Sequence, residues 1–84
     1  MSTTEQLNQA IGFRLRSIRE AQVPKLTQEV AAHLTGIKKQ AMSAIERGKQ
    51  SATVPQLVLL AQLYGIHPGV ILDENWCKLT IGSK

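Results

Sequence analysis

The chain has 84 residues, a formal net charge of +4 and 43% hydrophobic residues, enough for one small hydrophobic core and a single domain. Its single cysteine, Cys77, excludes an internal disulfide and a zinc site built from several cysteines of one chain. No apolar run approaches the ~20 residues that cross a membrane. The first five residues lack the basic segment of a secretory signal, so we expect a cytoplasmic protein.

The positive charge is concentrated in the first half of the chain. Residues 14–49 contain eight Lys or Arg residues and three Glu residues, whereas from residue 50 onward Lys78 and Lys84 balance Asp73 and Glu74. A basic excess confined to one region predicts a polyanionic partner there. A solvated basic surface is the alternative on charge alone.

The first predicted helix covers residues 4–22. Its apolar residues recur every three or four positions and form one stripe, which consists of Leu7, Ile11, Leu15 and Ile18. This spacing is typical of a helix with one buried face. Pro24 marks its end, because proline disfavours helical conformation in the residue before it.

Two short helices separated by a glycine turn are predicted next. The side chain of Thr27 can cap the second helix, residues 28 to about 34, and Gly36 permits a tight turn after it. The third helix, residues 38–47, ends at Gly48, in the position where glycine commonly follows a helix.

A fourth and a fifth helix complete the expected all-α fold. Thr53 and Gln56 match a capping box at the start of the fourth helix, and Pro68 stands at the favoured first position of the short fifth helix. We therefore predict a five-helix domain over residues 1–72. In the tail, residues 73–84, apolar residues alternate with polar ones, which allows a short strand, and a loosely ordered chain end is the alternative.

The third predicted helix has an unusually polar outer face. It leaves five side chains outside the core, namely Lys38, Lys39, Gln40, Ser43 and Arg47. Two lysines in its first turn oppose the helix dipole at a cost of ~0.3–1 kcal/mol each, and DNA phosphate would reverse the sign of that cost. The pattern predicts a helix-turn-helix over residues 27–47, with the third helix in the DNA major groove.

Residues 11–72 resemble the Cro/lambda-repressor (xenobiotic-response-element, XRE) helix-turn-helix family. The motifs that carry the resemblance are Leu26-Thr27-Gln28-Glu29, Ala32 with Thr35-Gly36-Ile37, Met42 to Lys49, Leu57, Leu60-Ala61 and Tyr64-Gly65-Ile66. The resemblance implies a compact lambda-repressor-like bundle of five helices that binds DNA. Lys38 departs from the pattern, because the family usually has a serine or threonine cap at this position.

The resemblance also implies roles for single residues. The base-facing positions of the recognition helix are occupied by Lys39, Gln40, Ser43 and Ala44. Gln28 corresponds to a residue that clamps a phosphate, and Arg19 and Glu46 stand where some members have a buried ion pair. Further candidates for phosphate contacts, by charge and position, are Arg14, Arg16, Lys38, Arg47, Lys49 and Gln50.

The expected function is a transcriptional regulator, most simply a repressor, that binds a near-palindromic operator on double-stranded DNA as a homodimer. The predicted dimer contacts are Val70, Ile71, Leu72, Trp76, Leu79 and Ile81, with closure of the monomer core as their alternative role. We expect no cofactor, metal ion, small-molecule ligand or enzymatic activity, since no motif of converging catalytic groups is present. The expected location is the nucleoid of a bacterial or phage-infected cell.

Two other functions remain open on the sequence alone. An antitoxin of a toxin–antitoxin pair would bind a partner protein through the tail and also bind its own promoter. A DNA-bridging factor would bind without reading bases, with an affinity that depends on salt and not on sequence.

Overall fold

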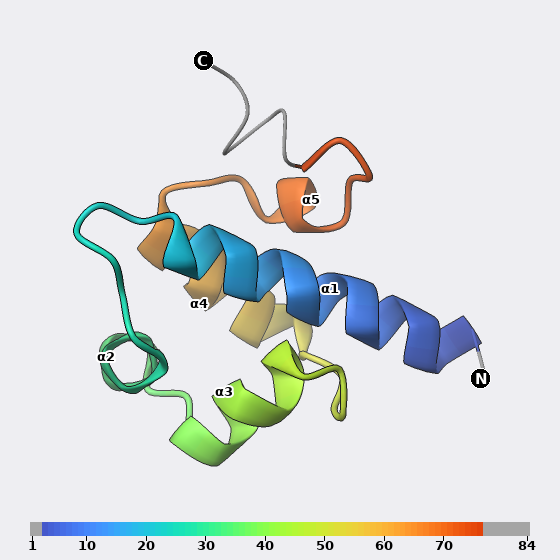
Figure 1. The fold of residues 1–84 in the computed structure, drawn as a ribbon, viewed down its shortest axis with the longest axis horizontal. Helices are drawn as coiled ribbons and strands as arrows, with labels where there is room; N and C mark the ends of the chain where they lie inside the picture. Colours follow the sequence, from blue (N-terminus) through green and yellow to red (C-terminus); the bar gives the residue numbers. More distant parts are fainter. Residues whose placement is uncertain (1–2, 77–84) are drawn as a thin grey trace.

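Five helices make up the described part of the computed structural model, residues 3–76 (Figure 1). They are α1 (Thr3–Glu20), α2 (Gln28–Thr35), α3 (Lys39–Glu46), α4 (Val54–Tyr64) and α5 (Pro68–Ile71). Over these residues there is no strand, and the predicted all-α fold with five helices is confirmed. The predicted C-terminal strand, with Leu79 and Ile81, lies outside the described residues. Within residues 3–76, none of the helices has both the length and the apolar content needed to cross a membrane.

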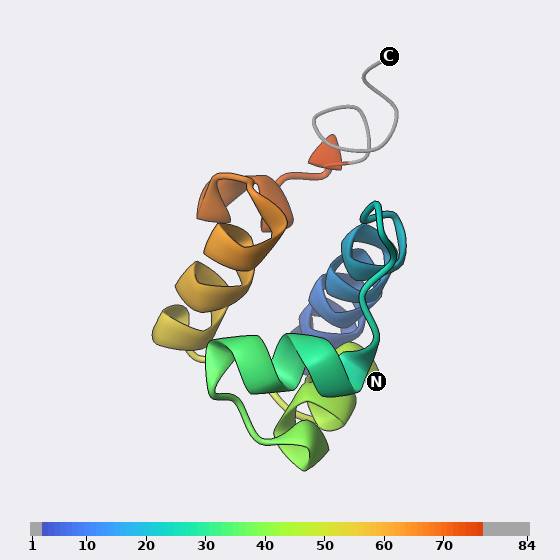
Figure 2. The ribbon, with the colours of Figure 1, turned by 90° about the vertical axis from the view of Figure 1, so that its left-hand side faces the viewer.

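Helix α1 is the longest element and lies between α5 and α3 in the view of Figure 1. Helix α3 packs against α1 and α2, and α4 packs against α2 and α5. Figure 2 shows α2 crossing below the ends of α1 and α4, with α3 beneath it. The arrangement leaves α3 on the rim of the bundle, with neighbours on one side only.

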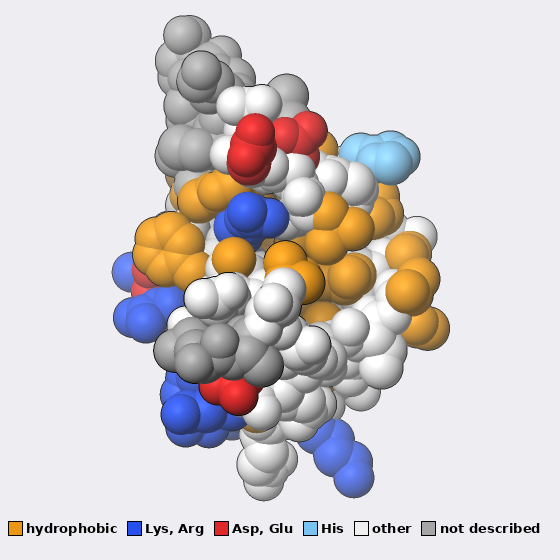
Figure 3. Space-filling view, turned by 90° about the vertical axis from the view of Figure 1, so that its right-hand side faces the viewer, with side chains coloured by type: hydrophobic (Ala, Val, Ile, Leu, Met, Phe, Trp, Pro, Cys, Tyr) orange, Lys and Arg blue, Asp and Glu red, His pale blue; other side chains and the backbone are white. Residues whose placement is uncertain are grey.

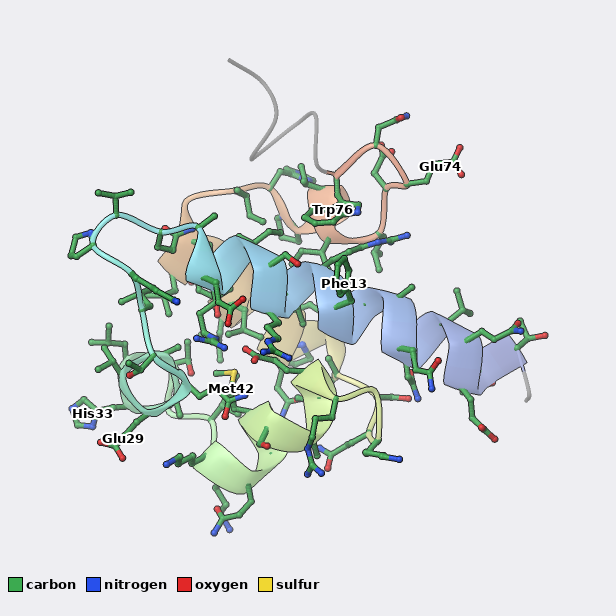
Figure 4. The ribbon with its side chains drawn as sticks, viewed as in Figure 1. Phe13, Glu29, His33, Met42, Glu74 and Trp76 are labelled. Carbon is green, nitrogen blue, oxygen red and sulfur yellow. The ribbon has the colours of Figure 1, made fainter. Side chains whose placement is uncertain are left out.

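The core is assembled from apolar side chains of all five helices. Six large residues are almost fully buried, namely Leu15, Ile18, Met42, Ile45, Leu60 and Ile71. Met42 projects from α3 toward α1 (Figure 4). The predicted stripe on α1 packs against the core from Ile11 to Ile18 but not at Leu7, which is 57% exposed. The first turns of α1 extend past the other helices, so this leucine has no core to enter (Figure 1).

Local hydrogen bonds define the helix starts that the sequence predicted. Thr27 Oγ1 accepts a hydrogen bond from Val30 N at 3.2 Å, and the capping box of Thr53 and Gln56 is complete. Helix α3 differs, because Lys38 occupies its N-cap position and provides no side-chain hydrogen bond. The first backbone N–H groups of α3 therefore lack the side-chain acceptor that a Ser, Thr, Asp or Asn cap supplies.

The end of the described chain packs against α1. Trp76 lies edge-on to Phe13, with ring centroids 6.1 Å apart and an interplanar angle of 86° (Figure 4). Ile71 has no exposed surface, which corrects its prediction as a dimer contact, because it closes the core of its own chain. Val70 is half-buried and Leu72 is 58% exposed. The other two predicted contacts, Leu79 and Ile81, lie outside the described residues.

Helices α1 and α3 approach each other closely at Gly12. A Cβ atom at this position would overlap the backbone carbonyl oxygens of Ile45 and Glu46. Backbone atoms cannot move aside as a flexible side chain can, so only glycine fits here without a shift of one helix. This contact sets the distance between α1 and the C-terminal turn of α3.

We predict that Gly12→Ala destabilises the protein by about 1–3 kcal/mol, the usual penalty for an extra methyl group in a tightly packed site. Urea unfolding followed by circular dichroism measures the change. Thr4→Ala, on an exposed turn of the same helix, is the control and is expected to change the free energy of unfolding by less than ~0.5 kcal/mol. Equal stabilities of the Gly12 variant and the parent would contradict the close approach.

Candidate nucleic-acid interface

Helix α3 has one buried and one exposed face. Met42, Ile45 and Glu46 are buried, with exposed fractions of 0%, 1% and 6%. Lys39 and Gln40 are exposed. The inner face therefore anchors the helix, and the outer face presents side chains that can donate hydrogen bonds to a ligand.

A shallow hollow of about 270 Å³ lies between α2 and α3. Its lining consists of Gln28, Lys39, Gln40, Ser43 and Arg47. These are three of the four predicted base-facing residues together with two of the predicted phosphate contacts. The fourth predicted base-facing residue, Ala44, is half-buried and lies outside this lining.

The ion pair between Arg19 and Glu46 joins α1 to α3. Arg19 Nε donates to Glu46 Oε2 at 2.8 Å, and Arg19 Nη2 donates to Glu46 Oε1 at 3.0 Å. The remaining terminal nitrogen, Nη1, donates to the carbonyl oxygen of Leu26 at 2.7 Å. Hydrogen bonding to the Glu46 carboxylate raises the pKa of Arg19 above its ordinary value, so the guanidinium stays charged. Both side chains are buried, and the bidentate geometry offsets the loss of their hydration.

Gln28 extends this network to α2. Its side-chain Nε2 donates to Glu46 Oε1 at 2.9 Å, so one carboxylate holds residues of three helices. An amide group carries two N–H donors. One donor of Gln28 is used inside the protein, and no hydrogen bond of the second donor is found within residues 3–76.

A family model described as a helix-turn-helix domain matches residues 10–74. The chain belongs to this family. The match runs from the middle of α1 past the end of α5 and includes α2, the turn at Gly36 and α3. The five-helix arrangement fits the lambda-repressor-like fold, in agreement with the resemblance to the Cro-like family. The chain has no significant match among curated proteins or among solved structures.

Most of the predicted phosphate contacts are exposed side chains. The exposed members of the predicted phosphate set are Arg16, Lys38, Arg47, Lys49 and Gln50. In Figure 3, many of the Lys and Arg side chains in view lie along the left and lower edges, and α3 lies at the lower end of the molecule. Arg16 forms an exposed ion pair with Glu20, with Nε and Oε2 3.4 Å apart.

Arg14 lies apart from this set, which corrects its place among the predicted phosphate contacts. At 3.6 residues per turn, it is rotated by about 200° around α1 from Gly12, which faces α3. Its Nη1 donates to the carbonyl oxygen of Ile71 at 2.9 Å. Arg14 thus ties α1 to the end of α5 on the far side of the bundle.

Lys25 and Glu29 were not among the predicted contacts, but both lie beside Lys39. A second hollow, of about 540 Å³, lies where the starts of α2 and α3 meet the loop after α1, and its lining includes Lys25, Glu29 and Lys39. Glu29 Oε2 lies 3.6 Å from Lys39 Nζ. The resemblance implied a phosphate contact for the neighbouring Gln28. The pair between Glu29 and Lys39 joins two helices, and no motif in the sequence indicates it.

Tyr64 of α4 lies near the buried network, and its phenol oxygen has no hydrogen-bond partner within the described part of the chain. Burial raises the pKa of this phenol, so it remains neutral. No group of three or more His, Cys, Asp or Glu side chains that could hold a metal ion is found among residues 3–76.

We predict that Glu46→Ala destabilises the domain by about 3–5 kcal/mol, because the buried guanidinium of Arg19 then stays charged without the carboxylate that accepts two of its hydrogen bonds. Thermal and urea unfolding measure this loss. Arg16→Ala removes the exposed pair with Glu20, leaves the contact of Glu20 with Arg19 in place, and is the control, with an expected change of ~0–1 kcal/mol. Similar losses for the two variants would contradict a special role for the buried pair.

Proposed function

We propose that this helix-turn-helix protein is a sequence-specific DNA-binding transcriptional regulator that inserts α3 into the major groove. The observation that carries the proposal is the hollow in which Lys39, Gln40 and Ser43 lie beside Gln28 and Arg47. A lysine ammonium can donate to guanine O6 and N7, and a glutamine amide can form paired hydrogen bonds with adenine. Ala44 can contribute at most an apolar contact with a thymine methyl group.

The flanking residues supply the contacts that position the protein on DNA. In this proposal Arg16, Lys38, Arg47, Lys49 and Gln50 bind phosphates on both sides of the inserted helix. Such contacts release counterions and contribute to affinity at every sequence, whereas base contacts discriminate between sequences. The open N-terminal turn of α3, without a side-chain cap at Lys38, adds backbone N–H donors that favour an anion.

The short length of the recognition helix supports a dimer. One helix contacts only a few base pairs, and each contributes ~1–3 kcal/mol of discrimination. One subunit therefore discriminates poorly between its own site and the many other sites of a genome. Two subunits related by a two-fold axis double the reading length and place their helices ~34 Å apart. We propose a homodimeric repressor of the nucleoid, with residues 1–72 as the DNA-binding domain and residues 73–84 as a dimerisation or partner segment.

The antitoxin alternative depends on the tail, most of which lies outside the described residues. No contact within residues 3–76 favours it over the regulator. Selection of bound sites from a random pool of DNA duplexes tests the proposed function directly. Enrichment of a near-palindromic consensus, with half-sites ~10 base pairs apart, is the expected result. Binding without enrichment of any sequence would contradict it.

Substitutions in the hollow are predicted to change the selected consensus. Lys39→Ala and Gln40→Ala are each expected to weaken specific binding by ~1–3 kcal/mol and to relax the preference at one or two base pairs. Lys49→Ala, outside the hollow, is expected to weaken binding to all DNA sequences alike. Binding-site selection with the three variants measures both effects, and an unchanged consensus for the two hollow variants would contradict the assignment of the base-reading residues.

The dimer is predicted to depend on Leu72. Leu72→Asp places a charge at an exposed apolar position next to α5, and we expect dimerisation to weaken by about tenfold or more, the range of an interface hot spot. Leu34→Asp is a matched control, because both leucines are 58% exposed and Leu34 lies on α2. Sedimentation equilibrium without DNA measures the association. A dimer unaffected by Leu72→Asp, or weakened equally by both variants, would contradict this interface.

A further inference from the structure

Glu29 places a carboxylate on the surface that the proposed function assigns to DNA. It stands in the first turn of α2, and Lys39 is the first residue of α3. The two side chains are 79% and 59% exposed, and both line the hollow at the junction of the two helices. A carboxylate here repels phosphate, so it weakens DNA binding unless it has another effect.

Helix α2 alone explains only part of this arrangement. A negative charge in the first turn of a helix interacts favourably with the helix dipole, and this stabilising effect accounts for an acidic residue at position 29. It does not account for the 3.6 Å contact with Lys39 on the other helix. The neighbouring Lys38 is also exposed and has no ion pair within the described residues, so pairing with Glu29 distinguishes Lys39 from the lysine beside it.

We infer that Glu29 is a positioning residue that sets the base selectivity of Lys39, an inference that rests on the proposed function. A lysine ammonium has three N–H donors. It can keep one on Glu29 and direct the others to the acceptors of a base edge. A contact between Lys39 and a phosphate is stabilised less, because the carboxylate of Glu29 offsets the positive charge of Lys39 and repels the phosphate.

The pair therefore favours sequence-dependent contacts of Lys39 over sequence-independent ones. Without the carboxylate, Lys39 becomes an ordinary exposed lysine that binds any phosphate within its reach. Affinity for unrelated DNA then increases, and the difference between the correct site and other sites decreases.

Glu29→Gln tests this inference, since it removes the charge and keeps the size of the side chain. Binding to the selected site and to an unrelated duplex is measured over a range of salt concentrations. Affinity for the unrelated duplex is expected to rise by about threefold to tenfold, and the slope of log K against log salt to steepen by up to ~0.9, the value for one additional phosphate contact. The ratio of specific to non-specific affinity is expected to fall, with relaxed preference at the base pair read by Lys39.

Two controls separate this effect from a general change in charge. Glu74→Gln makes the same change at an exposed position on the side of the molecule away from α3 (Figure 4) and is expected to leave the affinity ratio unchanged. In a Lys39→Gln background, Glu29→Gln is expected to cause no further fall in the ratio, because the lysine through which it acts is gone.

Three results would overturn the inference while the proposed function stands. They are an unchanged ratio in Glu29→Gln, an equal change in Glu74→Gln, and an undiminished effect of Glu29→Gln in the Lys39→Gln background. Failure of the parent protein to select any site would overturn the proposed function, and the inference with it. Circular dichroism of each variant shows whether the helices are retained.

Discussion

The carboxylate of Glu46 joins three helices at one buried point. It accepts two hydrogen bonds from Arg19 of α1 and one from Gln28 of α2, and α3 carries the carboxylate itself. Removal of both charges from water is unfavourable unless nearly every donor and acceptor is matched. The match here, completed by the Leu26 carbonyl oxygen, holds α3 in one orientation relative to the rest of the bundle.

The two ends of α3 are held very differently. Its C-terminal turn carries Glu46 and lies against Gly12, where the absence of a side chain lets the backbones of α1 and α3 come close. At its N-terminal end Lys38 provides no side-chain cap, and Lys39 and Gln40 are exposed. Orientation is therefore fixed at the inner end, and the outer end keeps backbone donors and charged side chains for a partner. A rigid support with an open reading end suits recognition of a groove.

Sequence reasoning was most successful where the determinants are local. The caps at Thr27 and Thr53 lie within three residues of their partners, and the five helices followed from them and from apolar spacing. Long-range contacts such as that between Arg14 and Ile71 depend on the rotation of whole helices, which spacing alone does not determine. The burial of Ile71 was missed for a different reason. The hydrophobic effect favours burial in the chain's own core and in an interface alike, so composition does not distinguish the two.

The division of α3 into an inner and an outer face also bears on how such a protein can diversify. Within α3, the residues that pack into the interior are Met42, Ile45 and Glu46, whereas the exposed Lys39 and Gln40 contribute little to the core. Exchange of the outer side chains therefore leaves folding almost untouched. Proteins with this fold can therefore change their exposed residues one at a time and remain folded. The residues that stabilise α3 and the residues that determine its surface chemistry are different ones.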